Sequence, residues 1–269
     1  MTNTAKLLIV AFVLIIVGSA GSMLTANASM FSYEERIIEN EGITEIAIRT
    51  RNESVELMPA VDGVMRVELS GVSMRDLSER LKVEVQGQKI TIETAGQRGI
   101  FDLDLFAEHL KLTVHLPQRL YESLQADMRN GSFAADLLQI NDLQVSTDNG
   151  SILLEDFEAA KVRVESDNGS IRLSQVSGDI MASSDNGSLS LSGEDWNRAI
   201  EMATHNGSIE IETATEPTNV TFDLRTRNGQ ITVFGSRDWD SVVGDGDHRV
   251  RLTTHNGDIR IERKTGLGR

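Results

Sequence analysis

The chain of 269 residues contains no cysteine. This absence excludes thiol catalysis, disulfide frameworks and metal sites ligated by cysteine. Proline is rare, with 3 residues, and aromatic side chains make up only 4% of the chain, whereas glycine occurs 22 times. Few aromatic residues together with many glycines fit a series of tight turns better than one large compact core.

Positive charge is also in short supply, with 26 Lys and Arg residues against 41 Asp and Glu residues and a net charge of -15 at pH 7. Such a surface repels phosphate backbones and anionic lipid headgroups. We therefore expect no nucleic acid among the partners. The simplest interpretation of the acidic excess is solubility, and attraction of cations or of a basic partner is the alternative.

Motifs of common enzyme classes are missing. The sequence contains no His-Glu-x-x-His, no Gly-x-Ser-x-Gly and no Gly-x-x-x-x-Gly-Lys. Acidic residues are frequent, but their spacing singles out no catalytic pair of the kind that glycan-cleaving enzymes use. The five histidines are scattered, although His205 and His255 each directly precede an Asn-Gly pair. We expect a protein that is not an enzyme, with no catalytic residue and no cofactor.

The N-terminal residues 1–28 read as an export segment. Lys6 precedes an apolar run, and Ala26-Asn27-Ala28 has the small-x-small form of a signal-peptidase site. Residues 7–24 are largely apolar and marginally long enough to cross a bilayer core of about 30 Å. The segment is either cleaved after Ala28 or retained as a membrane anchor over residues 7–24. Both alternatives predict an extracytoplasmic protein of the bacterial cell envelope, secreted or anchored in the membrane.

An internal repeat dominates the second half of the chain. Each unit has the pattern apolar-x-apolar-x-Ser/Thr-x-Asn-Gly-x-apolar-x-apolar, and successive Asn-Gly pairs are 19, 19, 18, 20, 22 and 28 residues apart. A period near 20 residues built from short strands is typical of a stacked array. The seven pairs are Asn130-Gly131, Asn149-Gly150, Asn168-Gly169, Asn186-Gly187, Asn206-Gly207, Asn228-Gly229 and Asn256-Gly257.

Two all-β architectures fit this repeat. In the first, each unit is one coil of a parallel β-helix, a solenoid-like array of about seven coils, and each Asn-Gly is a corner. In the second, each Asn-Gly closes an antiparallel hairpin of a sandwich. The near-constant unit length favours the solenoid, because stacked coils must have the same length, and any additional residues must form a loop outside the stack. Residues 212–219 and 235–247 are such surplus segments and are expected to protrude from one side.

The Asn-Gly pair is expected at these corners because both residues tolerate the positive φ of type I′ and II′ turns. In a solenoid the Asn side chains would form a ladder with hydrogen bonds from rung to rung. A second ladder is predicted just before the corners, from Thr147, Ser166, Ser184, Thr204, Thr226 and Thr254.

The repeat suggests a division of the chain into four parts. Residues 1–28 are the signal or anchor, 29–125 an irregular β region that caps one end, 126–263 the repeat solenoid, and 264–269 a charged tail. Within the second part, residues 43–48, 55–57 and 64–69 read as strands, residues 81–92 as a hairpin, and residues 110–116 as a strand that stops at Pro117.

The motifs of residues 112–117 and 250–259, together with the Asn-Gly-Ser/Asp-Ile units between them, carry a resemblance to a known family. Over roughly residues 43–261 the chain resembles the bacterial putative-adhesin family of unknown function, which includes LiaG-like membrane-anchored proteins. The resemblance implies a β-helix-like domain displayed outside the cytoplasm and, in some members, a link to envelope-stress operons of Gram-positive bacteria. It implies no agreed activity and no catalytic residue.

Three features are candidate binding sites. Asp148, Asp167 and Asp185 each precede an Asn-Gly pair and would stack in a solenoid as an oxygen-rich ladder for Ca²⁺, unless this corner position is simply exposed and accepts any polar residue. Trp196 and Trp239 would be platforms for sugar rings or, as their apolar repeat position favours, packing residues. A weaker cation candidate is the acidic loop with Asp238, Asp240, Asp245 and Asp247.

The expected function is therefore that of a non-enzymatic, adhesin-like binding domain whose ligand, a protein or a glycan, is an envelope or surface component. The alternatives are a membrane-anchored accessory protein of an envelope-stress signalling system and a glycan-active enzyme of the β-helix type.

Overall fold

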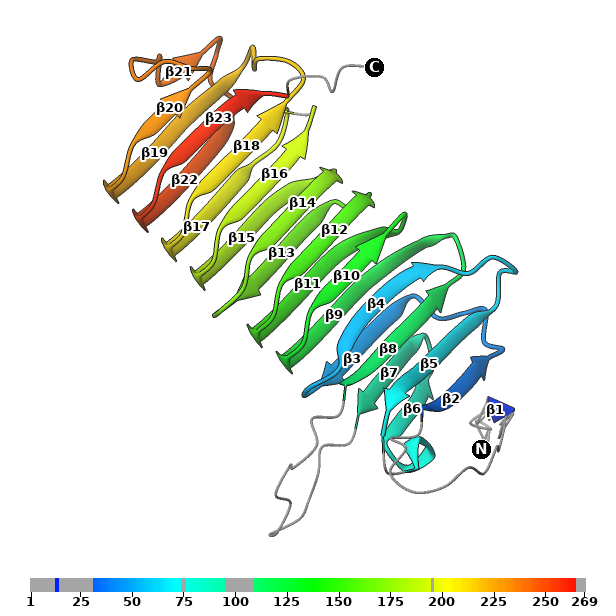
Figure 1. Cartoon of the computed structure of the whole chain (residues 1–269). Coiled ribbons are helices and arrows are strands. Elements are labelled where there is room, and N and C mark those ends of the chain that lie inside the picture. The colour runs from blue at the N-terminus through cyan, green and yellow to red at the C-terminus, as the bar shows by residue number, and fades with distance from the viewer. Residues whose placement is uncertain (1–12, 15–30, 74–75, 95–108, 195, 265–269) are drawn as a thin grey trace, which may run out of the picture.

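A computed structural model describes residues 13–14, 31–73, 76–94, 109–194 and 196–264. The chain winds into an elongated stack of coils, in which each regular coil contributes one strand to each of two facing sheets (Figure 1). The predicted solenoid is confirmed, and the antiparallel sandwich is wrong. From β9 to β18, neighbouring coils pair in parallel, for example Val145 with Val164 and Leu154 with Leu173.

The first sheet, called sheet A, has 12 strands. In spatial order they are β1 (Val13–Leu14), β2 (Phe31–Ile38), β5 (Met65–Val72), β8 (His109–Leu116), β4 (Ser54–Pro59), β10 (Phe133–Asp136), β12 (Ile152–Phe157), β14 (Ile171–Val176), β16 (Leu189–Gly193), β18 (Ile209–Thr213), β23 (Ile259–Arg263) and β20 (Ile231–Val233).

The second sheet, called sheet B, has 11 strands. In spatial order they are β21 (Val242–Val243), β19 (Val220–Asn228), β22 (His248–Asn256), β17 (Ile200–Asn206), β15 (Asp179–Asn186), β13 (Lys161–Ser166), β11 (Gln139–Asn149), β9 (Leu120–Asn130), β3 (Glu45–Thr50), β7 (Lys89–Thr94) and β6 (Leu81–Gln86).

Alternating apolar side chains from the two sheets fill the space between them. In the coil around Asn149, Leu143 and Val145 of β11 and Ile152 and Leu154 of β12 are at most 1% exposed. A third apolar position follows each coil, and Phe157, Val176, Trp196 and Val220 are buried there, as the repeat predicts. One continuous hydrophobic core therefore runs along the whole stack.

The Asn-Gly corners are not the turns that the pair suggests. Among the described residues, a positive φ at a non-glycine position occurs only at Leu137, Asp156, Gln175 and Phe234, so the expectation of a positive φ at Asn is wrong. Most of these Asn residues instead complete an extended strand, as Asn149 completes β11.

Glycine is required at the corners by close approach of the backbones. A Cβ built at Gly169 would lie 1.9 Å from the carbonyl oxygen of Gly150, and one at Gly187 would lie 2.0 Å from that of Gly169. Side chains cannot occupy such positions, because real Cβ atoms essentially never come within 3.0 Å of another heavy atom. Neighbouring coils can approach this closely at the glycine positions only because those positions carry no side chain.

Both predicted ladders are present. Each corner Asn donates its side-chain amide to the Asn of the neighbouring coil, at distances of 2.7–3.0 Å. At every corner of the seven except that of Asn130, the Ser or Thr two residues before the Asn donates its hydroxyl to a corner glycine carbonyl of a neighbouring coil, as Ser166 does to Gly150 over 2.9 Å. The same contact is made by Thr147, Ser184, Thr204, Thr226 and Thr254.

The array begins earlier than the repeat pattern indicates. Strands β3 and β4 form a further coil, and its Asn52 accepts a hydrogen bond of 2.8 Å from Asn130. In place of glycine this corner has Glu53, which is 2% exposed and is held by Arg80 and by the hydroxyl of Thr94. The predicted boundary between residues 125 and 126 thus falls inside β9. The expected hairpin is the antiparallel pair β6 and β7, which follows the 3-10 helix η1 (Leu77–Glu79).

At the other end, the coils do not stack in chain order. The last coil, β22 and β23, lies between the coil of β17 and β18 and the coil of β19 and β20 (Figure 1). The chain therefore skips one rung after β18 and returns to fill it after β20. The segments 212–219 and 235–247, which were expected only to protrude, are the two connections that make this detour, and the second contains β21, which pairs with β19.

The predicted signal or anchor is described only at Val13–Leu14, which pair with β2, and the remainder lies outside the described residues. Within the described part of the chain, no helix is long and apolar enough to cross a membrane.

Candidate functional site

The residue before each corner Asn forms a row across the outer face of sheet B, called here the corner row. In spatial order it contains Arg129, Asp148, Asp167, Asp185, His205, His255 and Arg227. Parallel, in-register pairing places equivalent residues on neighbouring strands about 4.8 Å apart. Because the coils at the C-terminal end are out of chain order, His255 lies beside His205, and Arg227 is one rung further out.

The three aspartates of the corner row are neighbours, as predicted, and all three are exposed. Asp148 also forms an ion pair of 3.6 Å with Arg129. In the described residues, no group of three or more His, Asp or Glu side chains is arranged to hold a metal ion. The geometry gives the cation ladder no support, and it stays a prediction that a Ca²⁺-dependent shift in melting temperature would test.

The acidic loop is arranged for a structural contact. Asp238, Asp240, Asp245 and Asp247 are exposed. Asp247 and Asn219 form two reciprocal hydrogen bonds of 3.0 Å, through the Asp247 carboxylate and its backbone N–H. These bonds fasten the returning connection to the chain just before β19.

The tryptophans pack instead of forming platforms. Trp196 is 7% exposed, meets Phe222 edge to face at 6.2 Å, and donates its indole N–H to Thr213 and to the carbonyl of Thr215. Trp239 is half-buried against the core. The packing interpretation is confirmed for Trp196, and a sugar platform at this residue is wrong.

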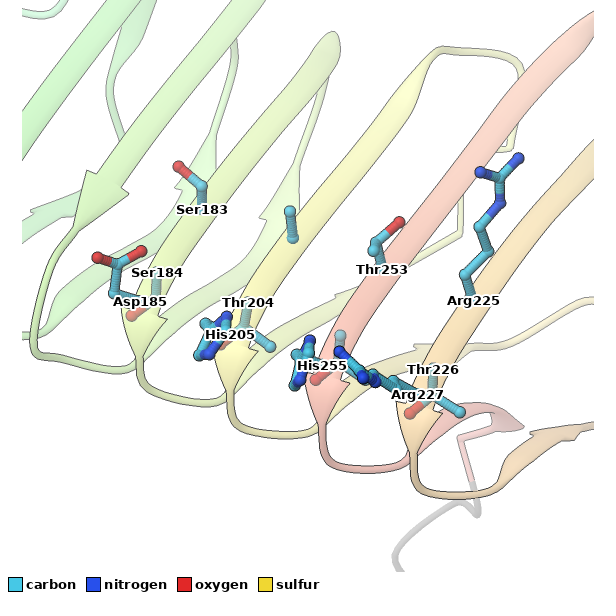
Figure 2. Close-up of a pocket in the computed structure, with 12 residues that line it drawn as sticks. Ser183, Ser184, Asp185, Thr204, His205, Arg225, Thr226, Arg227, Thr253 and His255 are labelled. Carbon is cyan, nitrogen blue, oxygen red and sulfur yellow. The ribbon is translucent and has the colours of Figure 1, made fainter.

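An open depression of about 470 Å³ lies over the C-terminal half of the corner row (Figure 2). Four neighbouring strands, β15, β17, β22 and β19, contribute to its walls. The exposed or half-buried polar groups in it include Asp185, His205, Thr253, His255, Arg225 and Arg227. Asp185 is the one carboxylate among the residues that line it.

Two imidazole rings stack at the centre of this depression. The centroids of His205 and His255 are 4.6 Å apart and their planes differ by 18°. The two residues are 50 positions apart in the chain, and only the inserted rung of β22 brings them together. Figure 2 shows the side chain of Arg227 extending toward His255 from the next strand.

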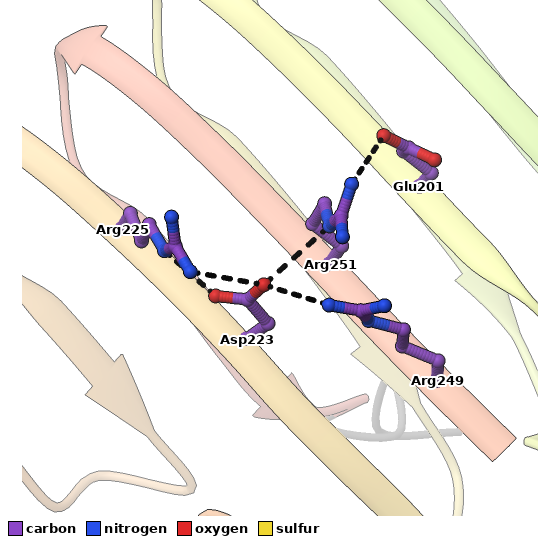
Figure 3. A network of polar contacts seen from close by, with 5 residues as sticks. All are labelled: Glu201, Asp223, Arg225, Arg249 and Arg251. Atoms are coloured by element: carbon purple, nitrogen blue, oxygen red, sulfur yellow. Dashed lines mark hydrogen bonds and ion pairs between the residues drawn. The ribbon is translucent and has the colours of Figure 1, made fainter.

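Beside the depression, three arginines surround a single carboxylate (Figure 3). Asp223 of β19 lies 2.8 Å from Arg225, 3.2 Å from Arg249 and 3.4 Å from Arg251. Arg251 also reaches Glu201 at 3.4 Å. Partial burial acts to raise the pKa of Asp223, but the contacts with these arginines together hold the pKa below its ordinary value.

Sequence reasoning identified part of this site. The repeat pattern places His205 and His255 at one position, but the candidate ladder that it offers is that of the aspartates, and Arg249 and Arg251 have no role in it. The sequence indicates their position through alternation: Arg249 and Arg251 alternate with the buried Val250 and Leu252. Both guanidinium groups therefore lie on the outer face of sheet B. What the sequence did not show is that β22 lies between β17 and β19.

Comparison with known proteins places the chain in a family. The Toastrack DUF4097 family profile matches residues 43–151 and 121–262. No curated protein matches the chain. Among solved structures, a putative adhesin from Bacteroides fragilis is 13% identical with a TM-score of 0.50, and the alignment covers 87% of this chain and 98% of that one.

Two further solved structures are similar. A putative cell adhesion protein from Clostridium sporogenes is 12% identical with a TM-score of 0.42, covering 87% of this chain and 100% of that one. A putative lipid binding protein from Parabacteroides distasonis is 15% identical with a TM-score of 0.35, covering 85% and 96%. At 13% identity, the similarity to the Bacteroides fragilis structure supports a shared fold only.

Proposed function

The chain belongs to the Toastrack DUF4097 family, and from this premise we propose that it is a non-enzymatic binding protein of the bacterial cell envelope. It binds its ligand through the outer face of sheet B. The observation that carries the proposal is the open depression over β15, β17, β22 and β19, where the corner row changes from Asp185 through two histidines to Arg227.

The repeat itself explains why binding is assigned to this face. The corner Asn and Gly residues and the buried Ser and Thr ladder are the same in successive coils because they hold the stack together. The outward residues of sheet B form no ladder that is repeated from coil to coil, and their identity differs between coils. Solenoid proteins use extended surfaces of this kind for binding.

The chemistry of the depression favours binding over hydrolysis. Glycan-cleaving enzymes use two carboxylates, one as acid and one as base or nucleophile. Asp185 alone supplies a carboxylate here, whereas the other polar groups are hydroxyl, imidazole and guanidinium donors. Such a set offers donors to a ligand and lacks the second carboxylate of the pair that these enzymes use.

The location at the envelope rests on the N-terminal sequence. Residues 1–28 have the form of an export signal, and the absence of cysteine is compatible with an exported protein that is stabilised by packing alone. The description of the Bacteroides fragilis protein as a putative adhesin is in line with a surface role.

The binding role is tested by sedimentation with purified cell-envelope fragments. We expect the full chain to co-sediment saturably and to release no soluble glycan. The double variant His205→Ala/Arg227→Ala should lose most of this binding, because it removes two polar groups of the depression. Arg172→Ala, on the outer face of sheet A, is the matched control and should bind like the wild type. Equal loss in both variants would contradict the assignment to sheet B, and released glycan fragments would show an enzyme.

The location is tested by fractionating the producing cells and sequencing the N-terminus of the mature protein. A new terminus at Ser29 in the medium indicates cleavage and release, and an intact terminus in the membrane fraction indicates an anchor over residues 7–24. Recovery of the intact chain in the cytoplasm would overturn the envelope assignment.

A further inference from the structure

The geometry points to a phosphate group as the ligand recognised in the depression, and we propose that Arg227, with His255 and His205, binds it. The biological role of this site rests on the proposed function. The existence of the site does not, because it follows from the charges and donors on the outer face of sheet B.

The first observation is a local reversal of charge. The chain has a net charge of -15, yet β19 and β22 present four arginines on one face. Asp223 and Glu201 balance only part of this charge. An anion that the rest of the surface repels is therefore attracted to this end of the stack. The arginines are Arg225, Arg227, Arg249 and Arg251.

Within this group, Arg227 is the guanidinium available to a ligand. Arg225, Arg249 and Arg251 are all engaged with Asp223, and their planes are oriented by it (Figure 3). Arg227 is exposed and forms no ion pair or hydrogen bond with any residue that the structure describes. A guanidinium presents a rigid fork of N–H donors that matches two oxygens of a phosphate.

The neighbouring rungs add donors without adding a competing carboxylate. His255 lies next to Arg227, and His205 stacks on His255 at 4.6 Å. A neutral imidazole carries one N–H donor, and the hydroxyl of exposed Thr253 on β22 supplies another. These groups line the same depression as Arg227 (Figure 2).

The length of the donor row limits the size of the anion. Arg227, His255 and His205 occupy three successive rungs, which span about 10 Å at the strand spacing of a sheet. The next rungs carry Asp185, Asp167 and Asp148, whose charges repel an anion. The site thus fits one compact phosphate group and disfavours an extended phosphate backbone lying along the stack.

The proposal is tested by titrating the full chain with inorganic phosphate at constant ionic strength, while the imidazole resonances of His205 and His255 are followed by NMR. We expect a saturable shift of both resonances. Arg227→Gln should weaken phosphate binding about tenfold, because it removes the charged fork. Arg129→Gln is a matched control with the same charge change at the other end of the corner row, and it should leave binding unchanged.

A second arm identifies the source of the phosphate. Glycerophosphoglycerol, a soluble diester equivalent to a lipid headgroup, is titrated beside inorganic phosphate. Binding of the diester with similar affinity supports a lipid headgroup as the source, and binding of inorganic phosphate alone supports a free phosphate or a monoester.

The absence of a saturable shift with both probes would overturn the phosphate site, and so would equal weakening in Arg129→Gln and Arg227→Gln. Failure of this site is distinguishable from failure of the proposed function. If the chain still co-sediments with envelope fragments without binding phosphate, the phosphate inference falls and the binding role stands. If phosphate binds but the envelope does not, the site stands and the proposed role falls.

Discussion

The central coils and the C-terminal coils are built from the same repeat but stack by different rules. From β11 to β16, each coil lies against the coil that precedes it in the chain. From β17 to β23, the chain skips a rung and then returns to fill it. The local pattern of a coil therefore determines its shape, whereas the connections determine its neighbours.

The detour also changes which coil is exposed at the end. The last coil in the chain is buried between two others, and the exposed coil of β19 and β20 is partly covered by β21. Open strand edges invite pairing with other chains, so this cover protects the end of the stack. The central coils have neighbours on both sides and need no such device.

The largest expected contrast between the two regions is at the corner glycines. Gly169→Ala should lower the free energy of unfolding by about 3 kcal/mol, because its Cβ would lie 1.9 Å from the carbonyl of Gly150 in a coil held on both sides. Gly229→Ala makes an equally close contact with Gly257, but the outermost coil can move away, so the loss should be smaller.

Chemical denaturation of both glycine variants measures this contrast. Gly193→Ala is the control, because the nearest atom to its Cβ would be 3.6 Å away. Equal losses in Gly169→Ala and Gly229→Ala would show that the end coil is as rigid as the centre.

A second contrast concerns the core. Leu173 is fully buried between two coils, and Leu173→Ala should cost about 3 kcal/mol through lost burial and the cavity left behind. Leu224 of the end coil is half-buried, so Leu224→Ala should cost about 1 kcal/mol. Urea denaturation at one temperature compares the two, and a larger loss at Leu224 would contradict the position of β19 at the end of the stack.

The asparagine ladder gives a third and smaller contrast. Asn168 bonds to Asn149 and to Asn186, at 3.0 and 2.9 Å, so Asn168→Ala should cost about 1 kcal/mol. Asn228 bonds along the ladder only to Asn256, at 2.8 Å, and its replacement by Ala should cost about half as much. The melting temperatures of the two variants show which replacement destabilises the protein more. A loss at Asn228 equal to or larger than the loss at Asn168 would contradict the position of β19 at the end of the stack.

The smallest expected effect is the dependence of stability on pH that Asp223 adds in the C-terminal coils. The pKa of Asp223 is lowered in the folded chain, so its contribution to stability is present above about pH 4, the usual pKa of an unfolded aspartate, and is lost as the pH falls further. The wild type should therefore melt above Asp223→Asn at pH 7.

This difference should vanish toward pH 2, because a protonated aspartic acid and Asn are both neutral. Asp142→Asn, at an exposed position of β11, is the control and should show no such change. A difference that persists at pH 2 would show that the contacts with the arginines do not depend on the charge of Asp223.

Much of the scaffold was predictable because its signals are local. Alternation of apolar residues around Asn149 defined two strands and their inward faces, and the constant spacing favoured parallel stacking over hairpins. The role of Gly169 was misread, since a close approach between coils is a contact between distant residues. The coil with Asn52 was missed because Glu53 occupies its corner in place of glycine.

By itself, the sequence determined the coil and the row on which each outward residue lies, since alternation and corner spacing are properties of a single unit. Only the tertiary structure decided the order of the rungs, because β19 and β22 carry equivalent apolar patterns and either would pair with β17. The order of the rungs places His205 against His255 and Arg227 on the next strand. It therefore creates the row of hydrogen-bond donors in the candidate site.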